Sequence, residues 1–165
     1  RVVMKRFLAC LLFAALPFSA QANTDLARQW GQEASRLSEE TSNYIYALDM
    51  GQSAEIPDTF ALDVYRFGRT SSDLAQWIES SNGPNDLGCI FRGMATESED
   101  QLATLEAEPD VIAHRASLRR LAAMFADAEI ISIAAQRRTP TAGRVATTLK
   151  QTCAADPQTV LFDLN

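Results

Sequence analysis

Apolar residues recur at intervals of three and four along most of this chain, and this periodicity constrains its fold more than any other feature. Such spacing places apolar side chains on one face of an α-helix. Runs typical of half-buried strands are absent, apart from Val160-Leu161-Phe162. The spacing predicts helices over residues 24–48, 57–81, 86–107 and 110–138, and a short fifth helix over residues 139–154.

Helix-ending and turn residues separate these segments. Gly51 follows the first predicted helix, and Asn82-Gly83-Pro84-Asn85 has the composition of a turn. Pro109-Asp110 opens the fourth helix, and Thr139-Pro140 opens the fifth. Short connections force neighbouring helices to run antiparallel. The sequence therefore predicts an all-α, single-domain up-down bundle of four main helices plus a short fifth helix.

Each predicted helix carries an apolar stripe that we expect to face the core. The fourth helix becomes apolar on most sides around Ile130 and Ile133, which predicts a centrally packed segment. Two capping-box patterns, Thr96-x-x-Glu99 and Ser98-x-x-Gln101, predict a break in the third helix near residue 97. The stripes are Leu26, Trp30, Leu37, Tyr44 and Leu48; Phe60, Val64, Phe67, Leu74 and Ile78; Leu87, Phe91, Met94, Leu102 and Leu105; and Val111, Leu118, Leu121 and Phe125.

The beginning of the chain has the pattern of a secretory signal peptide. Residues 4–6 are Met-Lys-Arg, residues 7–20 form an apolar run, and Ala20-Gln21-Ala22 is a small-x-small cleavage signature. Residues 1–3 precede Met4, the expected initiator. We expect cleavage between Ala22 and Asn23, which leaves one helical domain over residues 23–165.

Two other interpretations of this segment fit less well. The apolar run is shorter than a membrane span, which needs about 20 residues, and it contains Pro17. Cys10 lies at the start of the run, so no hydrophobic region would precede a lipoprotein cut there. We therefore expect export to the periplasm of a bacterial envelope without a membrane anchor.

The charge balance narrows the class of partner. Removal of residues 1–22 takes away Arg1, Lys5 and Arg6 and no acidic residue, so the formal net charge changes from −6 to −9. Nucleic acids and anionic membranes require a basic surface, and we expect neither as a partner. An acidic protein of this kind suits a basic protein as its partner. The sequence carries no signal for an oligomeric state.

The cysteines indicate a structural staple. Cys10 leaves with the signal peptide, so Cys89 and Cys153 remain, and in an exported chain two cysteines most simply form one disulfide. The closed loop spans 65 residues, for which chain-entropy estimates give about 4 kcal/mol of stabilisation. The alternative is a redox pair, but such pairs usually have Cys-x-x-Cys spacing.

The inventory of reactive side chains is small. His114 is the only histidine, so clustered His/Cys zinc sites and a Cys/His nucleophile are excluded, and a Ser-His-Asp triad has one possible base. We expect a partly buried structural histidine and no cofactor. The alternative is a haem held by His114 and Met50, because an up-down bundle brings the end of the first helix and the start of the fourth together.

Charged clusters provide the remaining candidate sites. Two acidic stretches lie near predicted helix starts: Glu97/Glu99/Asp100 and Glu106/Glu108/Asp110. Carboxylates there are stabilised by the helix macrodipole, so we expect these stretches to form solvated faces. The alternative is a site that binds a cation or performs acid-base catalysis. Gly93 in the third helix suggests a close helix approach or a kink. Arginines that could share an anion site are Arg66, Arg69, Arg92, Arg115, Arg119 and Arg120.

These observations favour a small exported acidic protein that acts by binding and without catalysis. One specific form is an immunity or inhibitor protein that neutralises a basic toxin or hydrolase; an acidic surface around a hydrophobic centre would favour it. A small-molecule-binding bundle, including the haem version, would show a closed apolar pocket. A carboxylate-dependent cell-wall hydrolase would show paired carboxylates in a cleft.

Overall fold

The computed structural model describes residues 18–52, 56–107 and 110–138, and within these ranges it contains four helices and no strand. The helices are α1 (Phe18–Asp49), α2 (Asp58–Ser80), α3 (Asn85–Glu106) and α4 (Val111–Arg137). Apart from the start of α1, their bounds lie within one residue of the predicted ones. The predicted fifth helix lies outside the described residues.

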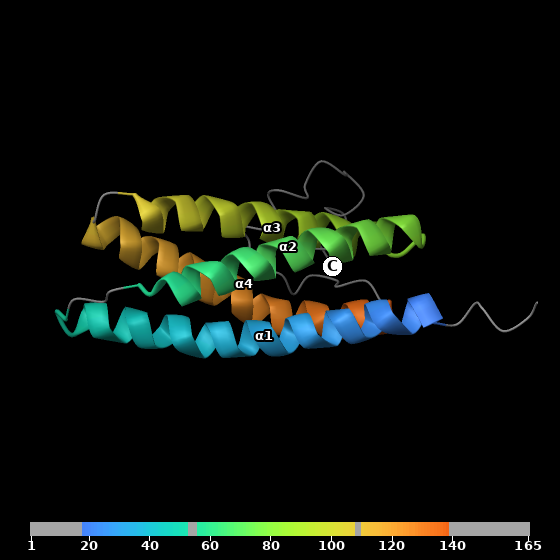
Figure 1. The fold of residues 1–165 in the computed structure, drawn as a ribbon, viewed down its shortest axis with the longest axis horizontal. Coiled ribbons are helices and arrows are strands. Elements are labelled where there is room, and N and C mark those ends of the chain that lie inside the picture. The colour runs from blue at the N-terminus through green and yellow to red at the C-terminus, as the bar shows by residue number, and fades with distance from the viewer. Residues whose placement is uncertain (1–17, 53–55, 108–109, 139–165) are drawn as a thin grey trace, which may run out of the picture.

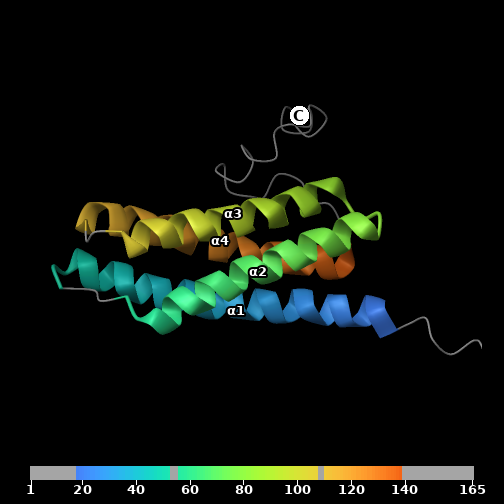
Figure 2. The same ribbon diagram turned by 45° about the horizontal axis from the view of Figure 1, so that its top comes forward.

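The four helices form a bundle in which successive helices run in opposite directions (Figure 1). The main packing partners are α1 with α4 and α2 with α3, while α1 and α2 contact one another less. In the ribbon views, α2 crosses the bundle at an angle and diverges from α1 along its length, and for this reason the two helices contact one another less (Figure 2). This divergence leaves room for a groove between the two helices.

An aromatic cluster joins the four helices at the centre of the core. Trp30 of α1 stacks on Phe67 of α2, with ring centroids 4.7 Å apart, and meets the edge of Phe91 of α3 at 5.1 Å. Phe125 of α4 lies edge-on to Phe67 at 5.0 Å. The indole N–H of Trp30 donates to Ser71 Oγ at 3.0 Å. Burial of these rings, which the apolar stripes predicted, holds the helices in register.

The helix ends follow the capping rules. Asp110, predicted as the first residue of the fourth helix, is the N-cap of α4, and its side chain accepts a hydrogen bond from the Ile112 N–H at 2.9 Å. Gly51, with a φ of +72°, ends the first helical segment. No helix in the described ranges is both long and apolar enough to cross a membrane.

Two predictions about helix interiors are wrong. α3 continues without a break through residue 97, because the Ser98 hydroxyl donates to the Met94 carbonyl of the preceding turn at 2.8 Å and caps nothing. In α4, Ile130 and Ile133 are exposed, so only one side of this half of the helix is packed. Val111, predicted as core, is also exposed.

Candidate binding surfaces

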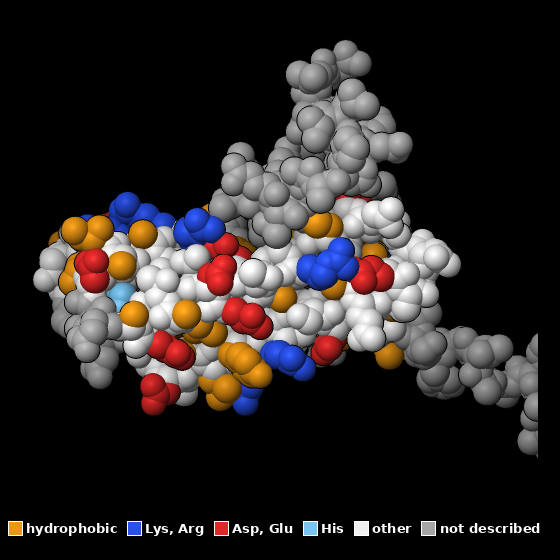
Figure 3. Space-filling view, turned by 90° about the horizontal axis from the view of Figure 1, so that it is seen from above, with side chains coloured by type: hydrophobic (Ala, Val, Ile, Leu, Met, Phe, Trp, Pro, Cys, Tyr) orange, Lys and Arg blue, Asp and Glu red, His pale blue; other side chains and the backbone are white. Residues whose placement is uncertain are grey.

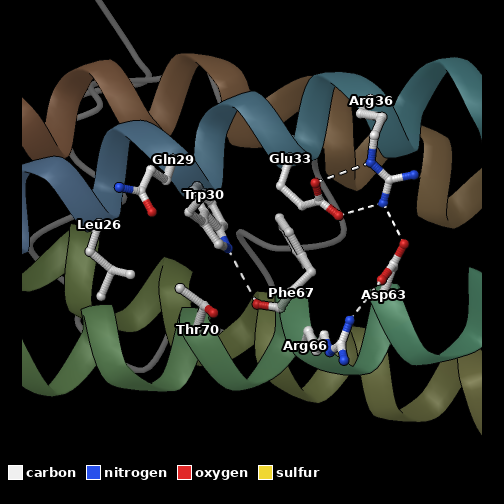
Figure 4. Close-up of a pocket in the computed structure, with 9 residues that line it drawn as sticks. All are labelled: Leu26, Gln29, Trp30, Glu33, Arg36, Asp63, Arg66, Phe67 and Thr70. Carbon is white, nitrogen blue, oxygen red and sulfur yellow. Dashed lines mark hydrogen bonds and ion pairs between the residues drawn. The ribbon is translucent and has the colours of Figure 1, made fainter.

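The first candidate surface is a groove of about 510 Å³ between α1 and α2 (Figure 4). Its floor is apolar, and Trp30 and Phe67, which contribute to it, are almost wholly buried in the core. Charged side chains from both helices line one end of it. The lining residues are Leu26, Gln29, Trp30, Glu33, Arg36, Asp63, Arg66, Phe67 and Thr70.

Arg36 organises the charged end of this groove. Its guanidinium donates to Glu33 at 2.5 and 3.1 Å, to Glu40 at 2.8 Å and, across the groove, to Asp63 at 2.6 Å. The hydrogen bonds to Glu33 in particular raise the pKa of Arg36 above its ordinary value. Asp63 also lies 3.4 Å from Arg66. The cluster therefore ties α2 to α1 at the point where the helices begin to diverge.

The two carboxylates at the charged end of the groove share one arginine. Glu33 and Asp63 both accept hydrogen bonds from the Arg36 guanidinium. Their oxygens therefore belong to the ion cluster that links α1 to α2. The groove is also open rather than a closed apolar pocket. These properties suit a structural ion cluster on an accessible surface.

The second candidate surface lies at the end of the bundle where α1 ends and α4 begins. Four large apolar side chains are exposed there: Tyr46 and Met50 of the α1 end at 67% and 60%, and Val111 and Ile112 of the α4 start at 55% and 77%. We call these four residues the end patch. Such residues are usually buried, and a group of them on a surface is typical of an interaction site.

Ion pairs hold the two halves of the end patch together. The Arg115 guanidinium lies 3.1 Å from the Asp49 carboxylate and donates to the Leu48 carbonyl at 3.0 Å, which satisfies the last turn of α1. Arg119 lies 3.5 Å from the same carboxylate. Met50 directly follows Asp49, and the first residues of α4 lie one turn before Arg115. The contact between Asp49 and Arg115 therefore brings the end of α1 and the start of α4 side by side.

Carboxylates surround this end of the molecule. Glu99, Asp100 and Glu106 are exposed on the last part of α3, and no ion pair in the described ranges involves them. Asp110 lies directly before the end patch. In the space-filling view, acidic, basic and hydrophobic side chains are interspersed at this end, on the face that carries α3 (Figure 3). Of the two acidic stretches, only Glu108 lies outside the described residues.

Glu97 differs from the other predicted acidic residues. Its carboxylate accepts two hydrogen bonds from Arg120 of α4, at 2.5 and 2.7 Å, and one from Gln101 at 3.0 Å. The hydrogen bonds from Arg120 to Glu97 raise the pKa of this arginine. Glu97 is therefore a packing residue between α3 and α4 rather than part of a free acidic face.

The structure does not assemble the predicted arginine site. Arg66 lies at the groove, Arg92 pairs with Glu79 between α3 and α2, and Arg115 lies at the end of α1. Arg120 is committed to Glu97, and Arg69 is exposed on α2. Arg92, Arg115 and Arg120 therefore tie neighbouring helices, and the six arginines are spread over three helices rather than gathered at one anion site.

His114 and Met50 lie at the same end of the bundle, as the haem hypothesis requires, but their environments differ. His114 is half-buried, and its Nε2 has no hydrogen-bond partner among the described residues. Met50 is largely exposed beyond the end of α1. The groove described above is lined by neither residue. Within the described ranges, no group of three or more His, Cys, Asp or Glu side chains could hold a metal ion.

The remaining predicted residues are only partly within view. Cys89 is half-buried on α3, away from the core stripe as predicted, but Cys153 lies outside the described residues. The predicted cleavage position, Ala22–Asn23, lies within the second turn of α1. Gly93 is buried in α3. Comparison with protein-family models, with curated proteins and with solved structures finds no match to this chain.

Sequence reasoning missed the two features that define these surfaces. The i, i+3 and i, i+4 spacing of Glu33, Arg36 and Glu40 was a detectable signal for a local cluster, but its link to Asp63 depends on helix packing. The exposure of Ile112 had a weaker signal in the sequence. Ile112 lies in the first turn of α4, so no earlier turn of the same helix can cover it.

Proposed function

We propose that this chain is an exported, non-catalytic protein that forms a stoichiometric complex with a basic protein. The charge distribution at the α1/α4 end carries the proposal. Of the arginines at this end, Arg115 and Arg119 share the Asp49 carboxylate and Arg120 pairs with Glu97. The exposed carboxylates of α3 form no ion pair in the described ranges, and only Asp100 lies close enough to Arg120 to add to the effect of Glu97, which raises the pKa of this arginine. This acidic face is able to attract a cationic surface.

The specific form that we favour is an immunity or inhibitor protein that neutralises a basic toxin or hydrolase. An acidic surface around an apolar centre suits such a protein, because the charges speed encounter and the apolar centre slows dissociation. The predicted signal peptide is consistent with a partner in the periplasm. The open groove and its bridged carboxylates give less support to the small-molecule and hydrolase alternatives.

We also propose that Cys89 and Cys153 are bonded in the exported form, with residues 139–154 as a fifth helix. Arg138, at the end of α4, donates to the Ser81 carbonyl and hydroxyl at 2.6 Å. This contact places the end of α4 beside the turn before α3, and Cys89 lies in the second turn of that helix. The 14 residues between Arg138 and Cys153 can span the remaining distance.

The complex can be sought directly. Full-length chain with a C-terminal tag, expressed in its source bacterium, is recovered from the envelope, and the co-purifying protein is purified and titrated by calorimetry. The proposal predicts a basic partner and a fixed stoichiometry. It also predicts weaker binding by Asp100→Lys than by Asp73→Lys, since both carboxylates are exposed but only Asp100 lies near the α1/α4 end. Turnover of a cell-wall substrate that one carboxylate substitution abolishes would show that the protein belongs to another class.

A further inference from the structure

We infer that the end patch is the docking surface for the basic partner, and that it receives an amphipathic segment whose apolar side chains are flanked by lysine or arginine. This inference rests on the proposed function and specifies the surface and the chemistry that complete it.

The end patch is the most exposed apolar surface of the two helices. The patch residues are each more than half exposed, whereas the other exposed apolar residues of α4, Ile130 and Ile133, are 44% and 49% exposed. Ile112, at 77%, is the most exposed of the large apolar side chains in the described ranges. An apolar surface of this kind gains most from contact with the apolar face of another molecule.

The two halves of the patch lie at the same level of the bundle. Asp49 contacts Arg115, so residues directly after Asp49 in α1 lie level with those one turn before Arg115 in α4. Met50 and Ile112 are the residues at this level. Arg115 and Arg119 share the single carboxylate of Asp49, so one of their two positive charges is compensated there, and the attraction for a basic partner rests on the carboxylates around the patch.

The charges around the patch indicate a basic occupant. Asp110 lies directly before Val111, while Glu106 ends α3 at the same end of the bundle. A second copy of the chain would bring these carboxylates toward their own counterparts, which is unfavourable, whereas lysine or arginine would pair with them. The first residue of α1, Phe18, and the residue that follows α4, Arg138, both lie at the opposite end of the bundle (Figure 1).

The test uses a defined probe rather than an unidentified partner. A fluorescent peptide of 18 lysine and leucine residues in amphipathic helical order is titrated with the full chain, and anisotropy gives its Kd. A second peptide has the same composition but a scrambled order. The inference predicts that the ordered peptide binds more tightly, because only it presents an apolar face between basic flanks.

Two isoleucines of α4 supply matched variants. Ile112→Ser lies in the patch, whereas Ile130→Ser makes the same change at an exposed position near the other end of the helix. Loss of one apolar contact should raise the Kd of the ordered peptide about tenfold for Ile112→Ser and leave it unchanged for Ile130→Ser. Both positions are exposed, so both variants should fold, which thermal unfolding verifies.

Three results would overturn the inference: equal effects of the two substitutions, equal binding of the two peptides, or no binding of either. Amide chemical shifts of the unsubstituted chain provide an independent readout, since the inference predicts shifts at Met50 and Ile112 rather than at Leu26 and Thr70 of the groove. The proposed function can still hold in those cases, because the envelope complex and its dependence on Asp100 test it separately.

Discussion

A Cβ atom added to Gly31 of α1 would lie 2.2 Å from the Oγ of Ser132 on α4. Real side chains do not approach this closely, so the absence of a side chain at position 31 sets the spacing of the two helices. The pair α2 and α3 has a similar contact, because a Cβ on Gly68 would lie 2.9 Å from Ser98 Cβ. Both main helix pairs of the bundle therefore depend on a glycine that faces a serine.

Gly31→Ala should destabilise the protein by about 1–2 kcal/mol, because overpacking outweighs the gain of about 1 kcal/mol in helix propensity. Urea unfolding followed by circular dichroism measures the change. The double variant Gly31→Ala/Ser132→Gly removes the clash and should recover part of the loss. An unchanged or higher stability of Gly31→Ala would contradict the packing described for α1 and α4.

Glu97→Gln should lower the free energy of unfolding by about 1–2 kcal/mol, since it weakens two charge-assisted hydrogen bonds from Arg120. The matched control is Glu99→Gln, which neutralises an exposed carboxylate two residues away and should change stability by less than about 0.5 kcal/mol. Chemical denaturation compares the two variants. Equal effects of the two substitutions on stability would mean that the hydrogen bonds between Glu97 and Arg120 stabilise the protein no more than an exposed carboxylate does.

Stability should fall as the pH rises from 10 to 12, through Tyr44. Burial and the hydrogen bond to Glu40 raise the pKa of this phenol from 10.0 to about 12. A raised pKa stabilises the folded state below pH 10, and this contribution is lost as the pH passes through the folded value. Tyr44→Phe should flatten the loss, whereas Tyr46→Phe, which removes an exposed phenol, should retain it. Thermal unfolding across this range provides the measurement.

The exported protein should begin at Asn23 and contain one disulfide between Cys89 and Cys153. Intact mass gives the first residue, and peptide mapping without reduction gives the bond. Reduction should lower stability by up to about 4 kcal/mol, as expected for a loop of 65 residues. Two titratable thiols in the unreduced protein, or a product that retains the apolar run, would contradict these expectations.

Much of the fold could be predicted because it depends on local patterns. Apolar spacing placed Trp30, Phe67, Phe91 and Phe125 in the core, where they meet in one cluster. Pro109-Asp110 marked the start of α4, which begins one residue later with the Asp110 carboxylate bonded to the Ile112 N–H. These signals operate within one or two helical turns and need no knowledge of neighbouring helices.

The features that could not be predicted depend on the register between helices. Val111 fits the apolar stripe of α4, but it lies in the first turn, where the bundle ends and leaves it exposed. Glu97 looked like a solvated acid until packing placed it opposite Arg120, 23 residues away. Exposure of the end patch is likewise a consequence of where the helices stop relative to one another.

The most direct test of the account is the rate at which the protein associates with its purified envelope partner, measured by stopped flow as salt rises from 0.01 M to 0.15 M. Screening shortens the Debye length from about 30 Å to about 8 Å over this range. We predict that the rate falls at least about tenfold and that Asp100→Lys lowers it further at low salt, since steering by opposite charges speeds encounter. A rate that is insensitive to both salt and Asp100→Lys would contradict the account.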